Sequence, residues 1–425
     1  MNSKITNQFL NEEKLQWLVV FCCILQFVGF VSSRVLASTG MIGILFVALF
    51  LFNGIKTIRS FLARKELWVL SFFFIIVFIS GIYSTDKDAW MNWVRIKIPF
   101  VVLPLSFAAL KKLDEKKFIV ILYGFILTLF LSSTVVIANY FFHYTEITNS
   151  FSAGGGIPMP FSRIRFTLML AFSFFCLFYI FENKKNVRWK NEKWIQLLLL
   201  VFSFVALHIL AVRSSLLALY IGLFFLLFRY VFFKREYVKG GLFLIILIVI
   251  PFSAQKIIPS LKNKMDYMRY DNLEFEEGHI NNLSDAMRRI SVIAGIEVAK
   301  QNFWFGVGAG DLKQEMNNYY KLKYPILDPK NYKLPHNQLV WVLTSTGIIG
   351  FVLFLFSFVY PYFKSRLYKN FLSVILFLII FSSFFTEATL EEQIGVGFFL
   401  IFLLLFINQS QLENDEMESI SNSNF

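Results

Sequence analysis

Long apolar runs, separated by short polar stretches, recur along almost the whole chain. Runs of roughly 17–25 residues are what an α-helix needs to cross the hydrocarbon core of a bilayer. We therefore predict an all-α polytopic membrane protein with about twelve transmembrane helices. The predicted spans lie near residues 15–33, 35–53, 67–84, 96–110, 118–142, 166–182, 195–212, 214–233, 241–254, 338–360, 371–386 and 396–407.

One polar stretch is far longer than the others. It covers residues 255–337, between the ninth and tenth predicted spans, and we expect one large extramembrane loop there. Loops of this length are usually lids or sites rather than simple connectors. The predicted domains are residues 1–254 with nine spans, the loop 255–337, residues 338–407 with three spans, and a polar tail at 408–425 that we expect to be disordered.

Lysine and arginine are distributed unevenly between the two sides of the predicted bilayer. If the N-terminus is cytoplasmic, the short cytoplasmic loops hold roughly three times as many of them as the short loops opposite. We therefore place both termini in the cytoplasm and the loop 255–337 in the periplasm. The net charge of +13 follows this topology and forms no basic face with interleaved aromatic residues, so we predict no nucleic-acid partner.

Composition supports a membrane protein and gives no sign of a metal. Hydrophobic residues make up 57% of the chain and charged residues only 16%, well below the share of a soluble protein. Cys22, Cys23 and Cys176 fall inside predicted spans, without the spacing of a disulfide or a metal site. We predict neither a metal nor a cofactor.

Arg213 stands between two apolar runs in "HILAVRSSLLAL", with almost no loop around it. Its side chain either snorkels to water or binds a ligand, because an arginine at the membrane boundary is costly unless it is paired or holds an anion. Ser214 and Ser215 follow at the predicted start of a helix, where hydroxyl and amide donors favour anions. This stretch is a candidate anion-binding site.

The stretch "SDAMRRISVIAGIEVAKQN" is predicted to be a helix of the large loop, with Ser284 as its N-cap. Arg288 and Arg289 are either ordinary surface arginines or are placed there to receive something negative. Helical periodicity puts them on one face with the apolar residues Val292, Ile293, Ile296 and Ala299.

The glycine-rich stretch "FWFGVGAGD", residues 303–311, follows this helix. It is not a nucleotide-binding loop, because no predicted strand precedes it and GK[ST] is missing. We expect a flexible turn whose exposed amides shape a polar pocket. Asp311 either orients a neighbour in that pocket or serves the local structure.

His336 is one of four histidines and precedes the tenth predicted span in "KLPHNQLVWVLTSTGIIG". It is either a satisfied structural histidine or a base, since neutral imidazole commonly removes a hydroxyl proton near neutral pH. Arg163 and Arg165 stand on the same predicted side of the membrane, at the start of the sixth span. Three carboxylates there either balance the arginines or are solvated: Glu387, Glu391 and Glu392.

Taken in order, these motifs resemble the O-antigen ligase and polymerase superfamily of bacterial membrane glycosyltransferases. "VRSSLLAL" is similar to the arginine motif of that family, with Ser214 where glycine is common. "MRRISVIAGIEVAKQNFWFGVGAGD" resembles its arginine helix and GxGxG segment, but departs at Val292 and Phe303, where an aromatic and a proline are frequent. "PHNQLVWVLTSTGIIG" is similar to its histidine motif. The spacing to Gly306 favours Arg288 over Arg289 as the family arginine.

The resemblance implies a GT-C-like enzyme of the bacterial inner membrane with its active site facing the periplasm. It implies metal-independent, inverting transfer of a glycan from undecaprenyl diphosphate. Arg213 and Arg288 would hold the diphosphate, and His336 would take the proton of the acceptor hydroxyl. Further substrate contacts are expected from Arg289, Arg163, Arg165, Ser214, Asn337 and Asp311.

Several functions share these residues. A ligase, which we favour because it suits the single late loop, would use a lipid A-core hydroxyl as acceptor. A polymerase would use a lipid-linked glycan repeat, and a protein O-oligosaccharyltransferase would use a protein. A lipid-linked glycan transporter is the alternative from another class, although such folds usually show internal repeats and polar sites at the midplane.

Overall fold

The computed structural model of the chain describes residues 12–151, 154–184 and 192–410. Most of the predicted tail 408–425 lies outside these residues. Helices without strands make up the regular structure of the described part, which confirms the all-α prediction.

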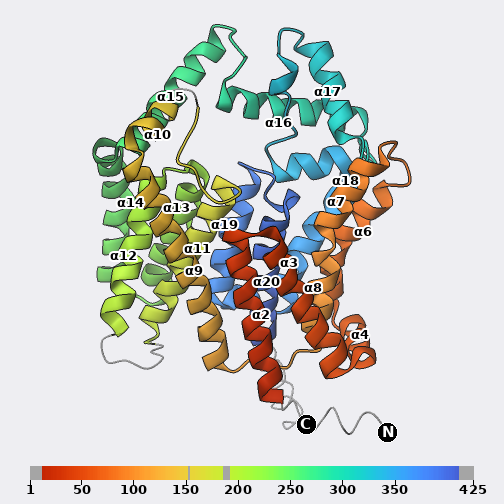
Figure 1. Cartoon of the computed structure of the whole chain (residues 1–425), viewed down its shortest axis with the longest axis vertical. Helices are drawn as coiled ribbons and strands as arrows, with labels where there is room; N and C mark the ends of the chain where they lie inside the picture. Colours follow the sequence, from red (N-terminus) through yellow and green to blue (C-terminus); the bar gives the residue numbers. More distant parts are fainter. Residues whose placement is uncertain (1–11, 152–153, 185–191, 411–425) are drawn as a thin grey trace.

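The helices are here given with the labels of Figure 1. Those before the large polar stretch are α2 (Glu12–Ser32), α3 (Arg34–Phe46), η1 (Val47–Asn53), α4 (Gly54–Ala63), α5 (Lys65–Trp68), η2 (Val69–Ser71), α6 (Phe72–Ser80), α7 (Lys87–Lys97), α8 (Pro99–Ala108), α9 (Glu115–Phe142), α10 (Tyr144–Ser150), α11 (Arg163–Glu182), α12 (Glu192–Leu210), α13 (Arg213–Phe228), η4 (Arg229–Phe233) and α14 (Tyr237–Ile257). Those that follow are α15 (Pro259–Glu276), α16 (Ser284–Gln301), α17 (Leu312–Lys323), η5 (Pro329–Asn331), α18 (Gln338–Lys364), η6 (Leu367–Lys369), α19 (Phe371–Phe384), η7 (Thr389–Glu391) and α20 (Gln393–Gln409).

Eight helices of the described chain are long and apolar enough to cross a membrane, so the chain is a multi-pass membrane protein. They are α2, α7 with α8, α9, α11, α12, α13 with η4, α14 and α18. A ninth span arises if Arg34–Phe50 and Gly54–Ala63, which meet at a bend of 103°, count as one. The shorter apolar helices α19 and α20 coincide with the last two predicted spans. The count of twelve stays a prediction.

Helix α20 forms the centre of the bundle rather than a lipid-facing surface. A helix that is hydrophobic all round is buried, and nearly every side chain of α20 is enclosed by protein. The Phe402 ring lies 5.4 Å from that of Phe27, 4.7 Å from Phe125 and 4.8 Å from Phe172. Helices α2, α9 and α11 therefore pack around α20 through aromatic side chains.

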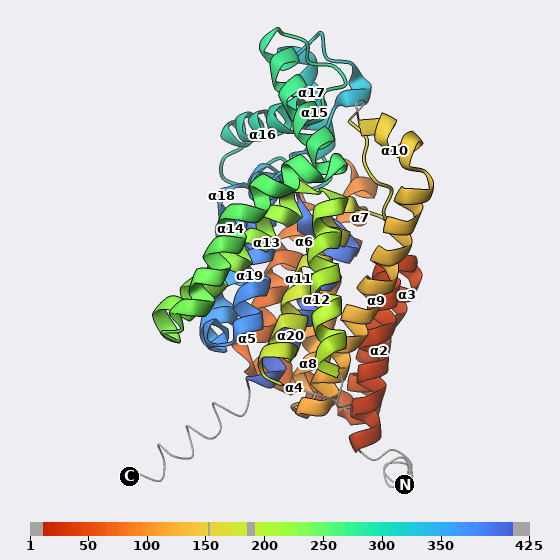
Figure 2. The same ribbon diagram turned by 90° about the vertical axis from the view of Figure 1, so that its left-hand side faces the viewer.

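The large polar stretch is mainly helical and lies above one end of the bundle (Figures 1 and 2). We call residues 259–337, which contain α15, α16 and α17, the cap. Both described ends of the chain lie at the opposite end of the bundle (Figure 2). There Lys111 pairs with Glu12 at 2.7 Å and its carbonyl accepts a hydrogen bond of 3.1 Å from Asn408. Which compartment the cap faces stays a prediction.

Helix α18 is interrupted at Gly347, whose φ of 65° and ψ of −173° are not helical. The glycine-rich segment 303–308 of the cap lies against this break. Three main-chain hydrogen bonds with N···O distances of 2.8–3.0 Å join the two, from Val307 to Thr344, from Gly308 to Ser345 and from Ile348 to Phe303. Irregular backbone near a membrane is tolerated where protein satisfies its polar groups in this way.

The predicted flexible turn with exposed amides is therefore wrong. The amides of Val307 and Gly308 donate to carbonyls of α18, and those of Ala309 and Gly310 donate to the hydroxyls of Ser80 and Ser84, each at 3.2 Å. Glycine is required because the backbones nearly touch: a Cβ on Gly306 would lie 2.5 Å from the nitrogen of Gly347. The segment anchors the cap to the bundle.

Candidate active site

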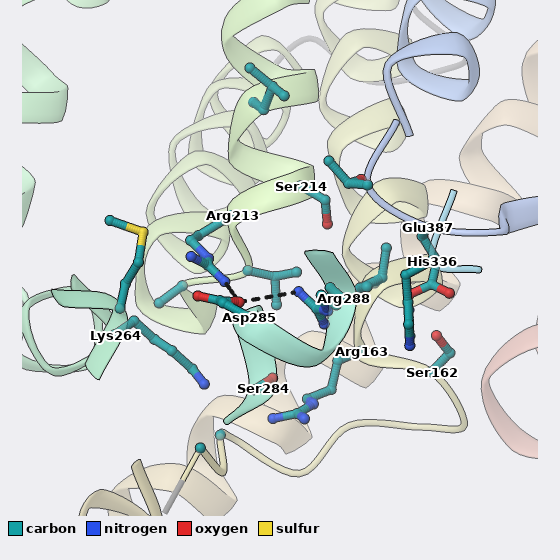
Figure 3. A pocket seen from close by; sticks show the side chains of 18 of the residues that line it. Ser162, Arg163, Arg213, Ser214, Lys264, Ser284, Asp285, Arg288, His336 and Glu387 are labelled. Carbon is teal, nitrogen blue, oxygen red and sulfur yellow. Dashed lines mark hydrogen bonds and ion pairs between the residues drawn. The ribbon is translucent and has the colours of Figure 1, made fainter. Parts of the chain in front are cut away.

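A cavity of about 1130 Å³ lies where the cap meets the beginnings of α11 and α13 (Figure 3). Its walls come from residues 154–165, the junction of α12 with α13, helices α15 and α16, His336, and the loop between α19 and α20. Of the residues predicted from sequence, the cavity brings together His336, Arg213, Arg288, Arg289, Arg163, Arg165 and Ser214. Asn337 and Asp311 are not part of its lining.

Arg213 begins α13 immediately after α12 ends, across a turn in which Ala211 has a φ of 53°. Its guanidinium forms an ion pair with Asp285 of α16. The same oxygen of Asp285 lies 3.9 Å from Nη1 of Arg288. Asp285, which the sequence did not single out, thus holds the two arginines from different elements together (Figure 3).

The two serines after Arg213 behave differently from each other. Ser214 lines the cavity, whereas the hydroxyl of Ser215 donates to the carbonyl of Val212 at 2.8 Å. Ser214 therefore remains available to a ligand, and Ser215 closes the first turn of its own helix.

The N-terminus of α16 is capped from another helix, and not by Ser284 as predicted. Asp271 of α15 is fully buried and accepts the backbone N–H groups of Asp285 and Ala286, each at 2.9 Å. The side chain of Ser284 makes no cap. Two of the amides that a helix leaves free at its N-terminus donate to this carboxylate. Asp271 therefore fixes where α16 begins.

The predicted common face of α16 is confirmed from Arg288 to Ile293. Arg288, Arg289, Val292 and Ile293 all line the cavity, whereas Ala299 is buried. Arg289 turns toward α15, where it lies 3.5 Å from the amide oxygen of Asn272 and 5.3 Å from the ring of Phe275. Arg288 remains beside Asp285, so its position suits an anion in the cavity better.

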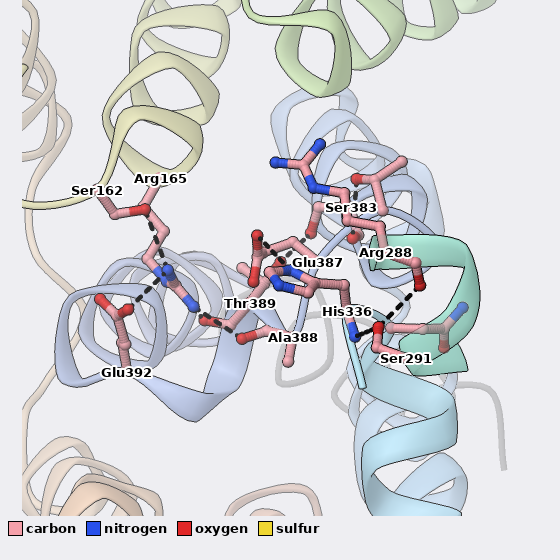
Figure 4. A network of polar contacts seen from close by, with 12 residues as sticks. Ser162, Arg165, Arg288, Ser291, His336, Ser383, Glu387, Ala388, Thr389 and Glu392 are labelled. Atoms are coloured by element: carbon pink, nitrogen blue, oxygen red, sulfur yellow. Dashed lines mark hydrogen bonds and ion pairs between the residues drawn. The ribbon is translucent and has the colours of Figure 1, made fainter. Parts of the chain in front are cut away.

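His336 projects into the cavity between the cap and the start of α18 (Figures 3 and 4). Its backbone N–H donates to the Ser291 hydroxyl of α16 at 3.2 Å. Its Nδ1 lies 3.4 Å from Oε2 of Glu387, a long contact, and the described residues offer it no hydrogen bond. The opposite ring nitrogen is left for a ligand.

Glu387 is ionised despite its position in the wall of the cavity. Burial by itself raises the pKa of this carboxyl. The nearby imidazole of His336 and the positive charges of Arg165 and Arg288 outweigh burial, so the pKa lies below its ordinary value. A carboxylate in this position also orients the imidazole ring.

The loop that carries Glu387 is held by Arg165 (Figure 4). The Arg165 guanidinium donates to the carbonyls of Ala388 and Thr389 at 2.7 and 3.1 Å and pairs with Glu392 at 3.1 Å. Its donors are thus committed to protein groups. Although Arg165 lines the cavity, its contacts suit it to hold the loop in position rather than to bind a substrate directly.

A buried network holds the other side of the same loop. Lys97 of α7 is fully buried and pairs with Glu391 at 2.7 Å. The second oxygen of Glu391 accepts a hydrogen bond of 2.6 Å from Gln338, two residues after His336. Glu391 and Glu392 therefore each balance a buried cation, and Glu391 also ties the histidine segment to the Glu387 loop.

Asp311 and Asn337 have local structural contacts. The Asp311 carboxylate accepts the N–H groups of Thr85 and Asp86 at 2.8 Å, just before α7. Burial by itself would raise the pKa of Asp311, but these hydrogen bonds, another from the Thr85 hydroxyl and the charge of Lys87 together hold it below its ordinary value. Asn337 caps α18 by accepting the N–H of Val340 at 3.0 Å.

Lys264 of α15 lines the cavity and was not identified from the sequence. Its ammonium donates to the carbonyl of Gly155 in the loop before α11. Burial, followed by the charges of Arg163 and Arg213, lowers its pKa to about 8. Nothing in the local sequence distinguishes this lysine from its exposed neighbour Lys262.

Comparison with known proteins supports the resemblance drawn from the motifs. Residues 198–355 match the family described as O-antigen ligase. This segment includes Arg213, Arg288 and His336, and it ends before Glu387. No curated protein matches the chain.

Proposed function

From the O-antigen ligase match and the cavity, we propose that this chain is a membrane glycosyltransferase of the O-antigen ligase type. It moves a glycan from undecaprenyl diphosphate to a hydroxyl of lipid A-core in the bacterial inner membrane, at a site facing the periplasm. The supporting observation is that one cavity contains both the pair Arg213 and Arg288 and the imidazole of His336. The carboxylate of Glu387 lies beside that imidazole.

The arginines hold the donor in this proposal. Arg213 and Arg288 converge on one carboxylate oxygen of Asp285, so they are already spaced to share an anionic oxygen. A phosphate can take the place of that carboxylate and form bidentate, charge-assisted hydrogen bonds. The same cations stabilise the charge that grows on the diphosphate as it leaves.

His336 is the base of the transfer step. The Glu387 carboxylate keeps the imidazole proton on Nδ1, so the lone pair of Nε2 faces the cavity. The acceptor oxygen attacks the anomeric carbon while Nε2 takes its proton, and the bond from that carbon to the diphosphate oxygen breaks. The diphosphate leaves with the electron pair, and the configuration at the anomeric carbon is inverted.

The proposed step requires no metal, because arginine supplies the positive charge that a cation provides in other diphosphate-using enzymes. The carrier product and the glycosylated acceptor are both lipids of the same membrane. A polymerase or a protein O-oligosaccharyltransferase could use the same donor machinery with a different acceptor, so the acceptor must be found by experiment.

The test compares lipopolysaccharide and lipid-linked glycan in the host strain, a strain lacking this gene, and strains complemented with variants. We expect the deletion to leave bare core, with long chains still on the carrier lipid. His336→Ala and Arg213→Ala should fail to restore ligation, because each removes a group that the proposed transition state requires. The expected loss in rate is roughly 10²–10⁴-fold.

The control is His279→Ala, which alters an exposed histidine of the cap that pairs with Glu274. It should restore normal lipopolysaccharide at normal expression. Core that carries a single repeat in the deletion strain would instead indicate a polymerase. An unchanged ladder would contradict both and point to protein glycosylation or transport.

A further inference from the structure

Two cations in the cavity are not used by the transfer step described above. Arg163 begins α11 and Lys264 lies on α15, and both line the cavity. In the part of the chain that the structure describes, the Arg163 guanidinium has no hydrogen-bond or ion-pair partner. Figure 3 shows both side chains on the same side of the Arg213–Asp285–Arg288 group.

The positive charge here exceeds what the protein neutralises. Besides burial, Arg163, Arg213 and Arg288 all lower the pKa of Lys264, whereas Asp285 raises it. Two further carboxylates of the cavity lining, Glu387 and Glu392, lie beside His336 and Arg165. Close to the Lys264 ammonium lie the Gly155 carbonyl, the Phe151 ring at 5.4 Å and the ring of Tyr267 at 5.8 Å. Burial raises the pKa of Tyr267, so this phenol is neutral here. Partly buried cations without counter-charges favour the binding of an anion.

The loop before α11 is shaped to leave these cations accessible. A Cβ on Gly156 would lie 2.3 Å from Nη1 of Arg163, and one on Gly154 would lie 2.8 Å from the hydroxyl of Tyr267. Gly154 also has a φ of 76°. The glycines let the backbone pass close over Arg163 and Lys264 without covering them with side chains.

We propose that Arg163 and Lys264 form a second phosphate subsite, which holds one phosphate of the lipid-linked diphosphate while Arg213 and Arg288 hold the other. This inference rests on the proposed function, which supplies a ligand with two phosphates. On binding, Lys264 exchanges the Gly155 carbonyl for a phosphate oxygen. The site thereby distinguishes a diphosphate from a monophosphate, and so the donor lipid from a carrier with a single phosphate.

The test measures binding of farnesyl diphosphate and farnesyl monophosphate to the full-length protein in detergent. We expect the wild type to prefer the diphosphate. Lys264→Gln keeps a donor for Gly155 and removes the charge, and it should weaken diphosphate binding about tenfold with monophosphate binding nearly unchanged. Arg213→Ala should weaken both ligands. The matched control Lys262→Ala, on the exposed side of the same helix, should bind like the wild type.

The pH dependence gives an independent check. Lys264 has a pKa of about 8, so its charge is lost as the pH rises through this value. Diphosphate affinity of the wild type should therefore fall between pH 7 and pH 9 (roughly one unit either side of that pKa), and Lys264→Arg should largely abolish this fall. Equal losses for both ligands in Lys264→Gln, or none, would overturn the second subsite. Failure of the wild type and Arg213→Ala to differ for either ligand would instead contradict the proposed function.

Discussion

At the scale of single residues, the chemistry of the cavity depends on pairs that come from different parts of the chain. His336 precedes α18, whereas Glu387 follows α19. Arg213 begins α13, whereas its partner Asp285 belongs to α16. The position of each proposed catalytic group therefore depends on the packing between the two elements that carry the pair.

Glu387→Gln tests the imidazole–carboxylate pair. The amide keeps the shape but removes the negative charge that, in the proposed mechanism, orients the imidazole and balances the proton it takes from the acceptor, so we expect kcat to fall roughly 100-fold with little change in the KM for the donor. Transfer assays with purified lipid-linked donor measure both constants. Glu297→Gln, which changes an exposed partner of Lys300 in the cap, is the matched control. Unchanged kcat in Glu387→Gln would refute the pair.

The same variant has an expected signature in stability. The pKa of Glu387 in the folded protein lies below its ordinary value of 4.5, so its ionised form stabilises the fold. This stabilisation is fully present at pH values above the ordinary pKa of 4.5. It is lost as the pH falls through the lowered pKa that Glu387 has in the folded protein. The difference in Tm between wild type and Glu387→Gln should thus be constant from about pH 6 to 8 and shrink below about pH 4.5.

Sequence patterns could identify residues that are unusual where they stand, but not their partners. Arg213 between apolar runs and His336 at the edge of a span were unusual in that sense. Asp285, Glu387 and Lys264 are common residue types in polar stretches, and only folding shows that they share the cavity. Lys264 is the clearest case, since Lys262 two positions earlier has the same type and is exposed.

At the scale of elements, glycines join the cap to α18. A Cβ on Gly347 would lie 2.3 Å from the carbonyl oxygen of Trp304, and its φ of 65° is strained for any other residue. The break in α18 and the close approach of segment 303–308 therefore depend on the same position.

Gly347→Ala is expected to destabilise the protein by about 2 kcal/mol or more, because the added methyl group collides with backbone and φ is positive. The measurement is the thermal midpoint in detergent. Gly241→Ala in α14 is the matched control, since a Cβ there meets nothing within 4 Å. It should leave stability unchanged or raise it by up to about 1 kcal/mol, as alanine is the better helix former. Equal effects of the two changes would contradict the anchoring role of Gly347.

Elements were predictable from periodicity, whereas their ends depended on tertiary contacts. The helix from Ser284 was found from its pattern, but its cap comes from Asp271 on another helix. Likewise, the glycines of segment 303–311 suggested a flexible turn, because sequence alone cannot distinguish glycine that provides freedom from glycine that permits close packing.

At the scale of the whole molecule, apolar runs predicted the membrane class but did not separate helices that face lipid from helices enclosed by protein. The last predicted span, 396–407, belongs to α20, which is buried almost completely. Its phenylalanines meet those of α2, α9 and α11 instead of acyl chains. Hydropathy measures only how apolar a segment is. An apolar helix can be buried in the protein core as well as in the bilayer.

Cysteine labelling can test the predicted orientation, since the native Cys22, Cys23 and Cys176 are buried. Leu322 in the cap and Tyr368 at the opposite end are 75% and 54% exposed. In spheroplasts, a membrane-impermeant maleimide should label Leu322→Cys. Tyr368→Cys should react only after the membrane is opened, because the basic residues around it predict a cytoplasmic position. The reverse result would place the cavity on the cytoplasmic side.

The main-chain bonds between segment 303–308 and α18 have a practical consequence. The cap cannot be excised as a separate module. A soluble fragment of it would expose amides and carbonyls that are hydrogen-bonded to α18 in the intact protein. Chimeras made to exchange acceptor preference between related enzymes must therefore take segment 303–308 and the part of α18 that bonds to it from the same parent. A swap that moves 259–337 should carry the first half of α18, through Ile349, along with it.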